Sequence, residues 1–332
     1  MPMRKFLVLA MVAALLSPVS ATAADCRWDQ SAGWVARENL KKGDKTWNKG
    51  VPLRFSADFS RRKDVPRIEG YLSSSSGTCG DKLTLTTVGS KKFTAAIYRM
   101  GYYNNHGARL VKLLKSPTQI SIDAKTPPGQ YLIKLSNNLR AATFVPFLVY
   151  GDAPSEATFI SSVLTWQSYN QWGGESLYKG ADGARETAAK TVSLDRPYDG
   201  DGSGQFRYME QPVVTMMEKI GIDTNYVTDL EVHNSPAVFE KTKSIIVGGH
   251  SEYWTIAMRD SIESAVGQGR NLIVFGGNTA YAITEINGRN ISNTVRENIG
   301  FNVILKENVK EADIYQLQKV LDSKHYILST NY

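Results

Sequence analysis

The spacing of apolar residues changes near residue 151, and this change constrains the fold more than any other feature of the chain. From about Asp25 to Tyr150, short apolar runs rich in β-branched and aromatic residues alternate with turn residues; the runs lie at 83–88, 93–98, 130–135 and 142–150. Many short strands without helical periodicity are typical of a β-sandwich. Pro146 lies inside the last run, which predicts an edge position or a bulge there. We therefore expect a β-sandwich domain over residues 25–150, followed by a linker at 151–154.

Beyond the linker, apolar runs alternate with helical patterns. Strands are expected at 157–164, 225–227, 244–248 and 271–275, and helices at 211–220, 234–240 and 255–268. Such alternation predicts a doubly wound parallel sheet with helices on both faces. The expected fold class is thus mixed: an N-terminal β-sandwich followed by an α/β domain of glutamine-amidotransferase-like shape over residues 151–305. Residues 306–332 are predicted to form a charged tail with an amphipathic helix near 311–321, and the C-terminus would be truncated if further strands belong to the domain.

The N-terminal residues indicate export. Arg4 and Lys5 precede an apolar run at 6–16, and small residues follow at 21–23. This is the pattern of a secretory signal peptide over residues 1–24, with cleavage near Ala23 or Ala24. The run is shorter than the ~20 residues that a membrane-spanning helix needs. An uncleaved anchor is the alternative. The mature protein is expected in the periplasm or secreted, with no membrane association after cleavage.

The composition excludes several kinds of metal site and partner. The chain has only two cysteines, which excludes a cysteine-ligated zinc ribbon or iron–sulfur cluster. In an oxidising compartment Cys26 and Cys79 are the one available pair, so we predict a disulfide between them that stabilises the fold by a few kcal/mol. The net charge of +7 is mild, and no basic run is interleaved with aromatic residues. Nucleic acid is therefore not an expected partner.

Candidate site residues follow three of the predicted strands. Glycines, aromatic residues and titratable or amide groups come directly after them, in the segments Thr165–Tyr178, Gly248–Trp254 and Gly276–Tyr281. In open α/β sheets, the loops after the strands form the ligand-binding crevice. A turn with packed aromatic residues would explain each segment alone, whereas the three together predict a site. His250 with Glu252 beside it suits proton transfer or metal binding. Ser251 does not lie in a nucleophile elbow.

Five ordered blocks then carry a family resemblance. They are Tyr98-Arg99-Met100-Gly101-Tyr102-Tyr103, the segment from Ser168 to Tyr178, Arg196-Pro197-Tyr198, the segment from Gly248 to Trp254, and Gly277-Asn278-Thr279-Ala280-Tyr281. Over about residues 67–281 the chain resembles the N,N-dimethylformamidase large-subunit (beta-subunit) family. The resemblance implies a mononuclear iron amidohydrolase, in which one glutamate and two tyrosines hold the metal. The family name also implies a small partner subunit; a homo-oligomer is the alternative.

Carried over to this sequence, the resemblance implies that Glu252, Tyr169 and Tyr198 are the iron ligands. Tyr178 and Tyr208 compete with Tyr198 for the place of the second tyrosine. Phenolate and carboxylate are hard anionic ligands that suit ferric iron.

The remaining site residues have expected roles in turnover. His250 or Glu252 would assist proton transfer, and Asn170 and Asn278 would donate hydrogen bonds to the developing oxyanion. The substrate would be a small amide, and the products a carboxylic acid and an amine.

Two other functions stay open from the sequence. A β-sandwich joined to an α/β domain also suits a non-catalytic extracytoplasmic protein that binds carbohydrate or cell wall. A sugar hydrolase with Glu175 and Glu252 as paired carboxylates is the third interpretation, and it requires the two groups to face each other at glycosidase separations.

Overall fold

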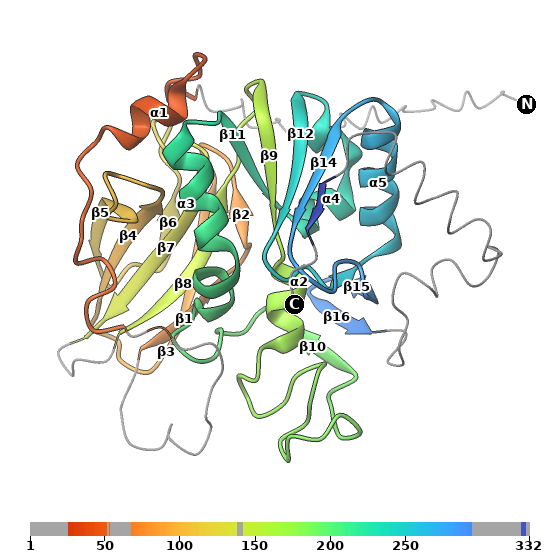
Figure 1. Ribbon diagram of the computed structural model, residues 1–332. Coiled ribbons are helices and arrows are strands. Elements are labelled where there is room, and N and C mark those ends of the chain that lie inside the picture. Colours follow the sequence, from red (N-terminus) through yellow and green to blue (C-terminus); the bar gives the residue numbers. More distant parts are fainter. Residues whose placement is uncertain (1–25, 52, 54–67, 138–141, 294–326, 330–332) are drawn as a thin grey trace, which may run out of the picture.

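The computed structural model describes residues 26–51, 53, 68–137, 142–293 and 327–329. The predicted signal peptide and the amphipathic helix expected near 311–321 lie outside these residues. The described residues form a mixed α/β structure with several sheets and few helices (Figure 1). None of their helices has the length and the apolar composition needed to cross a membrane.

The first half of the chain forms two sheets that share one core. A three-stranded sheet has the order β1-β3-β6 and a five-stranded sheet the order β2-β8-β7-β4-β5. Their strands are β1 (Glu69–Leu72), β2 (Ser76–Gly77), β3 (Lys82–Val88), β4 (Thr94–Met100), β5 (Ala108–Lys115), β6 (Gln119–Ser121), β7 (Gly129–Ser136) and β8 (Ala142–Val149). Leu85 of β3 belongs to the same buried cluster as Ile97 and Ile133 of the larger sheet, so each sheet buries one face against the other.

Pro146 occupies a place in β8 that a proline tolerates. It pairs with Leu132 of β7, whereas β2 pairs only with Leu148 and Val149 on the other side of β8. No β-ladder of the described strands therefore requires the missing proline N–H on that side. The edge position expected from the sequence therefore does not hold for β8 as a whole, because β2 pairs with its end, but Pro146 has no ladder partner on that side.

The second half contains a parallel sheet of order β11-β9-β12-β14-β17. Its strands are β9 (Ser155–Ser161), β11 (Thr224–Thr228), β12 (Thr242–Gly248), β14 (Asn271–Phe275) and β17 (Ile327–Ser329), all parallel to their neighbours. The strand order reverses between β9 and β12, because β11 lies on one side of β9 and all later strands on the other. Loops that leave the carboxyl ends of these two strands diverge there and open a crevice.

Helices cover both faces of the parallel sheet (Figure 1). The helices of the described residues are α1 (Trp34–Asn39), α2 (Val163–Tyr169), the π-helix η2 (Phe206–Glu210), α3 (Gln211–Ile220), α4 (Asp229–Asn234), the 3₁₀-helix η3 (Pro236–Phe239) and α5 (Ile256–Gly267). Met217 of α3 packs in one cluster with Ile246, and Met258 of α5 packs in another with Ile245. A further sheet of order β10-β16-β15-β13 comprises β10 (Thr191–Ser193), β13 (Tyr253–Trp254), β15 (Ala282–Asn287) and β16 (Asn290–Asn293).

Two sequence-based boundaries differ from the structure. The strand expected at 157–164 ends at Ser161, and α2 begins at Val163. The polar helix expected at 234–240 is instead α4 followed by η3. Thr228 caps α4 through a reciprocal bond with Glu231, which starts the helix earlier than hydrophobicity indicates. Pro236 then forces Ser235 into an extended conformation, so that α4 ends before it.

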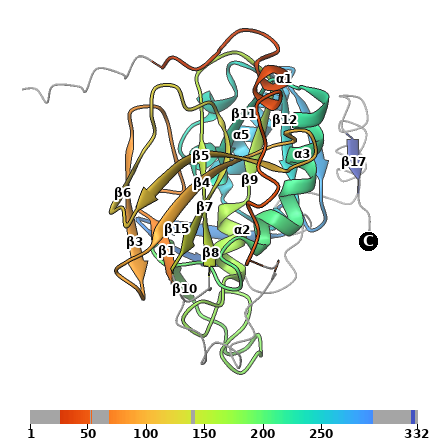
Figure 2. The same cartoon turned by 90° about the vertical axis from the view of Figure 1, so that its left-hand side faces the viewer.

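A buried ion pair joins the two halves. Arg99 of β4 and Glu218 of α3 are both 0% exposed, and Nη2 of Arg99 lies 2.7 Å from Oε1 of Glu218. Tyr226 donates to Oε1 and Asn39 to Oε2 of the same carboxylate, at 2.7 and 2.6 Å. Because each oxygen accepts two hydrogen bonds within the protein, the charge of Glu218 is well compensated. α3 therefore lies in a fixed position against the five-stranded sheet (Figure 2).

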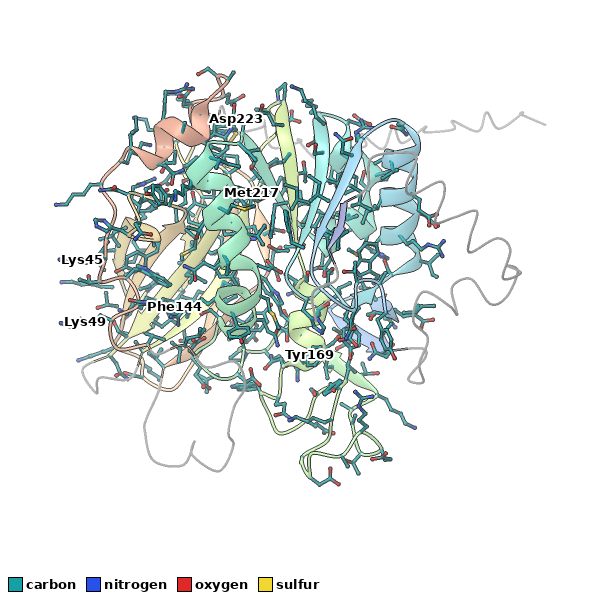
Figure 3. All side chains as sticks on the ribbon, in the orientation of Figure 1. Lys45, Lys49, Phe144, Tyr169, Met217 and Asp223 are labelled. Atoms are coloured by element: carbon teal, nitrogen blue, oxygen red, sulfur yellow. A yellow bond between two sulfur atoms is a disulfide. The ribbon has the colours of Figure 1, made fainter. Side chains whose placement is uncertain are left out.

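The N-terminal segment contacts both halves. Cys26 is bonded to Cys79 in the turn after β2, which confirms the predicted disulfide. Beyond it, the carboxylate of Asp223 accepts the backbone N–H groups of Gly33 and Val35, at 2.5 and 3.1 Å. Figure 3 shows Asp223 beside α1. The segment is thus fastened to the first half by a covalent bond and to the second half by a carboxylate.

The side chain of Glu210 holds the residues at the carboxyl end of β9 in place. This side chain is fully buried and accepts hydrogen bonds from the Ser161 hydroxyl at 2.8 Å, the Ser162 N–H at 2.9 Å and the Trp166 indole at 3.1 Å. Its Cγ also lies where a side chain at Gly249 would have to fit. Burial raises the pKa of Glu210 to about 8. Glu210 therefore ties η2, β9 and α2 together as a neutral acid below that pH.

Replacing Arg99 by methionine should destabilise the protein strongly. The change leaves the Glu218 carboxylate buried without its cation, which costs about 3–5 kcal/mol of unfolding free energy. Urea denaturation measures the loss. Arg259→Met is the matched control, because it removes a partner from the exposed pair with Glu263 and costs at most about 1 kcal/mol. Equal losses in the two variants would contradict a central role for the buried pair.

Glu210→Gln should change how stability depends on pH. A carboxyl whose pKa is raised on folding stabilises the folded state fully below its unfolded pKa, and this contribution is lost as the pH rises through about 8. Glutamine does not titrate, so the variant should lose less stability than wild type between pH 5 and 8, by several kcal/mol. Urea midpoints across this range report the difference. Glu263→Gln, at an exposed site, serves as control, and identical pH slopes for wild type and Glu210→Gln would disprove the assignment.

Candidate functional site

The crevice between β9 and β12 brings two predicted site segments together. α2 follows β9 after Ser162 and ends at Tyr169, and residues 249–252 follow β12. Because both segments leave the same edge of the sheet, their side chains converge although they are about 80 positions apart. Figure 3 shows Tyr169 at this end of the sheet.

Three predicted site residues form one cluster. The Tyr169 hydroxyl donates to Oε2 of Glu252 at 2.5 Å, and Nε2 of His250 lies 3.0 Å from the same oxygen. The Tyr169 hydroxyl and His250 Nε2 are 3.3 Å apart. The side chain of Glu252 is 6% exposed and that of His250 19%, so the imidazole is the part of the cluster nearer to solvent. Burial and the adjacent Glu252 carboxylate hold the pKa of Tyr169 far above its usual value, so the phenol keeps its proton here.

Backbone contacts fix Glu252 in place. The hydroxyl of Thr165 on α2 accepts the N–H groups of Glu252 and Tyr253 at 3.0 and 3.1 Å. The Ala282 N–H donates to the carbonyl of Glu252 at 3.0 Å. Glu252 is thus held between α2 and the start of β15. Thr165 begins the first predicted site segment, but its role as a positioning residue was not predicted, because a threonine on a helix carries no signal of the backbone groups that it will contact.

The loops after β12 and β14 touch each other through glycines. The Gly249 N–H donates to the carbonyl of Phe275 at 2.8 Å. A Cβ atom at Gly276 would lie only 1.6 Å from the carbonyl oxygen of Gly249, so a side chain cannot fit at position 276. Gly249 itself has a φ of 72°, a conformation that favours glycine. These glycines allow the third predicted strand end to lie against the segment that carries His250 and Glu252.

Aromatic rings surround Tyr169. The ring of Tyr178 lies 4.6 Å from it at an angle of 34°, and the ring of Tyr253 lies 5.8 Å away, nearly perpendicular. The guanidinium of Arg185 lies 4.6 Å from the centre of the Tyr178 ring and donates to the Tyr178 hydroxyl at 2.7 Å. Tyr178, an alternative second tyrosine from the sequence, therefore adjoins the Tyr169 cluster.

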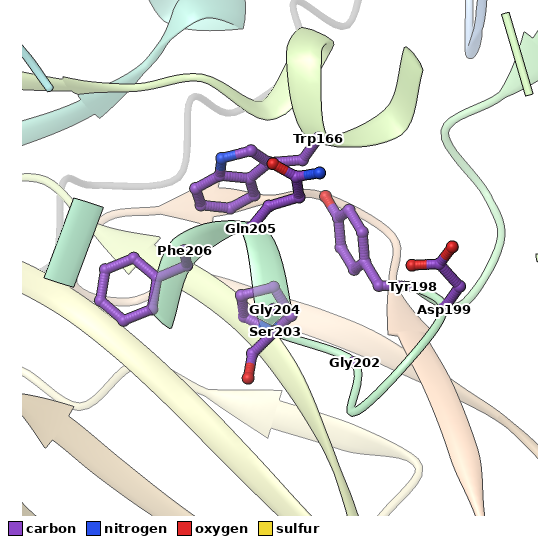
Figure 4. Close-up of a pocket in the computed structure, with 9 residues that line it drawn as sticks. Trp166, Tyr198, Asp199, Gly202, Ser203, Gly204, Gln205 and Phe206 are labelled. Atoms are coloured by element: carbon purple, nitrogen blue, oxygen red, sulfur yellow. The ribbon is translucent and has the colours of Figure 1, made fainter. Parts of the chain in front are cut away.

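Tyr198 lies in a different environment. Its ring packs edge-on against Trp166 at 6.1 Å and lines a small cavity with Asp199 and Gln205 (Figure 4). The cavity has a volume of about 10 Å³, room for about one water molecule. Burial raises the pKa of Tyr198 well above its usual value. No hydrogen bond between described residues joins Tyr198 to Glu252. Tyr208, the other alternative, lies on η2 and is 59% exposed.

The two predicted asparagines differ in their surroundings. Asn170 is buried, and its amide nitrogen donates to the Gln167 side chain at 2.9 Å and to the Pro197 carbonyl at 2.8 Å. Both of its N–H groups are thus used within the protein. Asn278 is exposed, in the turn after β14, with a φ of 55° that asparagine tolerates better than most residues. Its position leaves the amide accessible to a ligand.

The buried Arg196 holds the loop that follows α2. It donates to the carbonyl of Gln167 at 2.7 Å and to the carbonyls of Trp172 and Glu175 at 3.3 and 3.4 Å. Burial lowers the pKa of Arg196 to about 10. The backbone of Glu175 is therefore anchored while its side chain is exposed. The Glu175 and Glu252 side chains thus differ in exposure, since Glu252 is buried.

The donor set of the cluster differs from common metal sites. Across the described ranges, no three His, Cys, Asp or Glu side chains gather in a way that could hold a metal ion. A metal at this crevice would therefore need phenol oxygen as well as carboxylate and imidazole. Tyr169, Glu252 and His250 provide these three atom types within hydrogen-bonding distance of one another.

Comparison with known proteins agrees with the family resemblance. Residues 115–300 match the family described as N,N-dimethylformamidase beta subunit-like, C-terminal. The search of curated proteins gave no match. Among solved structures, a β-D-glucuronidase from Dictyoglomus thermophilum aligns with 6% identity and a TM-score of 0.17, over 63% of this chain and 43% of that one. This chain thus spans less than half of that structure, and so weak a likeness has no bearing on the fold or the function. The family match covers more than half of the sequence, and the chain belongs to the N,N-dimethylformamidase beta subunit-like family.

Proposed function

We propose that this chain is an exported amide hydrolase that works with a mononuclear iron centre in the crevice between β9 and β12. The observation that carries the proposal is the convergence of Tyr169, His250 and Glu252 on one carboxylate oxygen. Family membership supports the same reaction class.

The residues present fit a hard cation. The Tyr169 hydroxyl and the Glu252 carboxylate are oxygen donors 2.5 Å apart, and both become anionic when the phenol loses its proton. Such donors suit ferric iron better than zinc. Metal binding at these atoms would release the proton that Tyr169 now donates to Glu252. We therefore assign Tyr169 and Glu252 as ligands, and His250 as their neighbour.

The second tyrosine ligand has two candidates. Family blocks favour Tyr198, which the sequence places in Arg196-Pro197-Tyr198. Proximity favours Tyr178, since its ring contacts that of Tyr169 and its hydroxyl accepts from a guanidinium that would stabilise a phenolate. Variants of Tyr178 and Tyr198 would show which of the two tyrosines is the second ligand.

The chain's own groups would move the protons. When bound, ferric iron would polarise an amide carbonyl and acidify water. His250, at the exposed side of the cluster, would take a proton from the attacking water and return it to the departing amine nitrogen. The oxygen of water bonds to the carbonyl carbon, the C–N bond breaks, and a carboxylic acid and an amine result. Asn278 would donate a hydrogen bond to the developing oxyanion. Asn170, in contrast, would hold the Pro197 segment in place.

The disulfide supports export. Cys26 and Cys79 remain paired only where the surroundings are oxidising, as in the periplasm or outside the cell. Residues 1–24 would accordingly be a secretory signal peptide that is removed on export. A small partner subunit or a second copy of the chain would complete the assembly.

We also propose a fold type for each half of the chain. Because two sheets share one core, we assign residues 25–150 to a β-sandwich. The parallel sheet and its order favour a glutamine-amidotransferase-like domain over residues 151–305.

Elemental analysis and the visible spectrum of the mature protein test the centre directly. We expect about one iron per chain and a tyrosinate-to-iron absorption band, because a phenolate ligand gives such a band. The double variant Tyr169→Phe with Glu252→Ala should lose both while the disulfide forms normally. Tyr71→Phe, on β1, is the matched control and should keep both.

Single variants then identify the second ligand. Loss of the band in Tyr178→Phe but not in Tyr198→Phe would assign Tyr178, and the reverse would assign Tyr198. Wild-type protein that stays colourless and iron-free after incubation with iron would contradict the proposal. Full iron occupancy in the double variant would show that the ligands lie elsewhere.

A further inference from the structure

Arg185 places a positive charge beside the aromatic rings of the candidate site. Its guanidinium stacks on Tyr178 at 4.6 Å, and the Tyr178 ring stacks on Tyr169 at 4.6 Å. Tyr169 in turn donates to Glu252. A continuous series of side chains therefore leads from the buried carboxylate to an exposed cation.

The turn around Arg185 is held by its own hydrogen bonds. The Ala184 N–H donates to the Asp182 carboxylate at 2.9 Å, and the hydroxyl of Thr187 also donates to it. The Ala188 N–H donates to the carbonyl of Arg185 at 3.1 Å. Stacking and the bond to Tyr178 fix the guanidinium itself. An exposed arginine is usually free to move, whereas this one has already lost much of its rotational freedom.

The charge of Arg185 has no carboxylate partner in the described part of the chain. Other arginines do form such ion pairs there: Arg37, Arg99, Arg109, Arg207, Arg259 and Arg289. The nearby carboxylate of Asp182 is engaged by Ala184 and Thr187 instead. Arg185 uses one of its five N–H donors on Tyr178, so the planar group can still bind an anion through two parallel hydrogen bonds.

We propose that Arg185, placed by Tyr178, binds a carboxylate on the substrate, so that the amide hydrolysed by this chain is anionic. The inference rests on the proposed amide hydrolase function, which it makes more specific. Arg185 would attract the carboxylate to the end of the crevice that lies away from Glu252, the proposed iron ligand. Two successive stacking separations of 4.6 Å place the carboxylate several bonds from the C–N bond. Water then adds to the amide carbonyl, the C–N bond breaks, and a dicarboxylate and an amine form.

Matched substrates test the preference. The probes are N,N-dimethyl monoamides of straight-chain dicarboxylic acids with about three to six methylene groups, each compared with its neutral methyl ester. For the best chain length, iron-loaded wild type should show a kcat/KM at least about tenfold higher for the anion than for the ester. Arg185→Gln should lose this ratio. Lys243→Gln, which removes an equal charge near the amino end of β12, should keep it.

Binding without turnover separates this inference from the proposed function. Calorimetry should detect the same monoamide carboxylates on wild-type protein, with affinity that falls as salt increases and is lost in Arg185→Gln. If no amide is hydrolysed but binding still depends on Arg185, the hydrolase proposal fails and the carboxylate site stands. Equal turnover of acid and ester by wild type would overturn the carboxylate site and leave the hydrolase intact. Absent binding to wild type, or equal binding to Arg185→Gln, would also overturn it.

Discussion

The parallel pairing of β9 with both β11 and β12 determines where the chemistry of this chain can lie. Because β9 is flanked on opposite sides by strands that come later, the segments after β9 and β12 emerge side by side at one edge. Tyr169 is brought there by a short helix and Glu252 by a four-residue loop. A shift of one residue in this pairing would turn the loops in another direction, since alternate residues of a strand face opposite sides. The register of β9, β11 and β12 therefore determines how Tyr169, His250 and Glu252 lie relative to one another.

Buried acids keep this arrangement rigid. Glu210 connects the end of β9 to η2 and α2, and Glu218 connects α3 to the first half through Arg99. Each acid is surrounded by donors from several elements, so no single element can move without breaking a buried hydrogen bond. The site thus lies on elements that are coupled to the packing of the whole chain.

Much of this could be predicted from the sequence, because periodicity reports on local burial. The helix at 211–220 matches α3 at both ends, since Pro212 suits a first turn and Gly221 adopts the left-handed conformation that ends it. The segments that carry Tyr169, His250 and Glu252 were also predicted, because glycines and titratable groups follow apolar strands there.

Other features depended on contacts that no local pattern reveals. Thr165 and Glu210 position the site through bonds to residues distant in sequence. The sequence likewise could not show that Tyr178 lies on Tyr169 while Tyr198 packs on Trp166, since only the path of the loop after α2 separates these tyrosines.

The contacts of the N-terminal segment with the two halves form at different stages of folding. Residues near Cys26 are made before the partners that hold them, because the disulfide requires Cys79 and the bonds at the start of α1 require Asp223. During synthesis the segment therefore emerges before Cys79 and Asp223, the residues that it will contact. The first half can form its disulfide and the bonds from Tyr103 and Arg109 to Glu38 of α1 on its own. The bonds of Gly33 and Val35 to Asp223, in contrast, need the second half. All the contacts of the N-terminal segment are therefore formed only when both halves have folded.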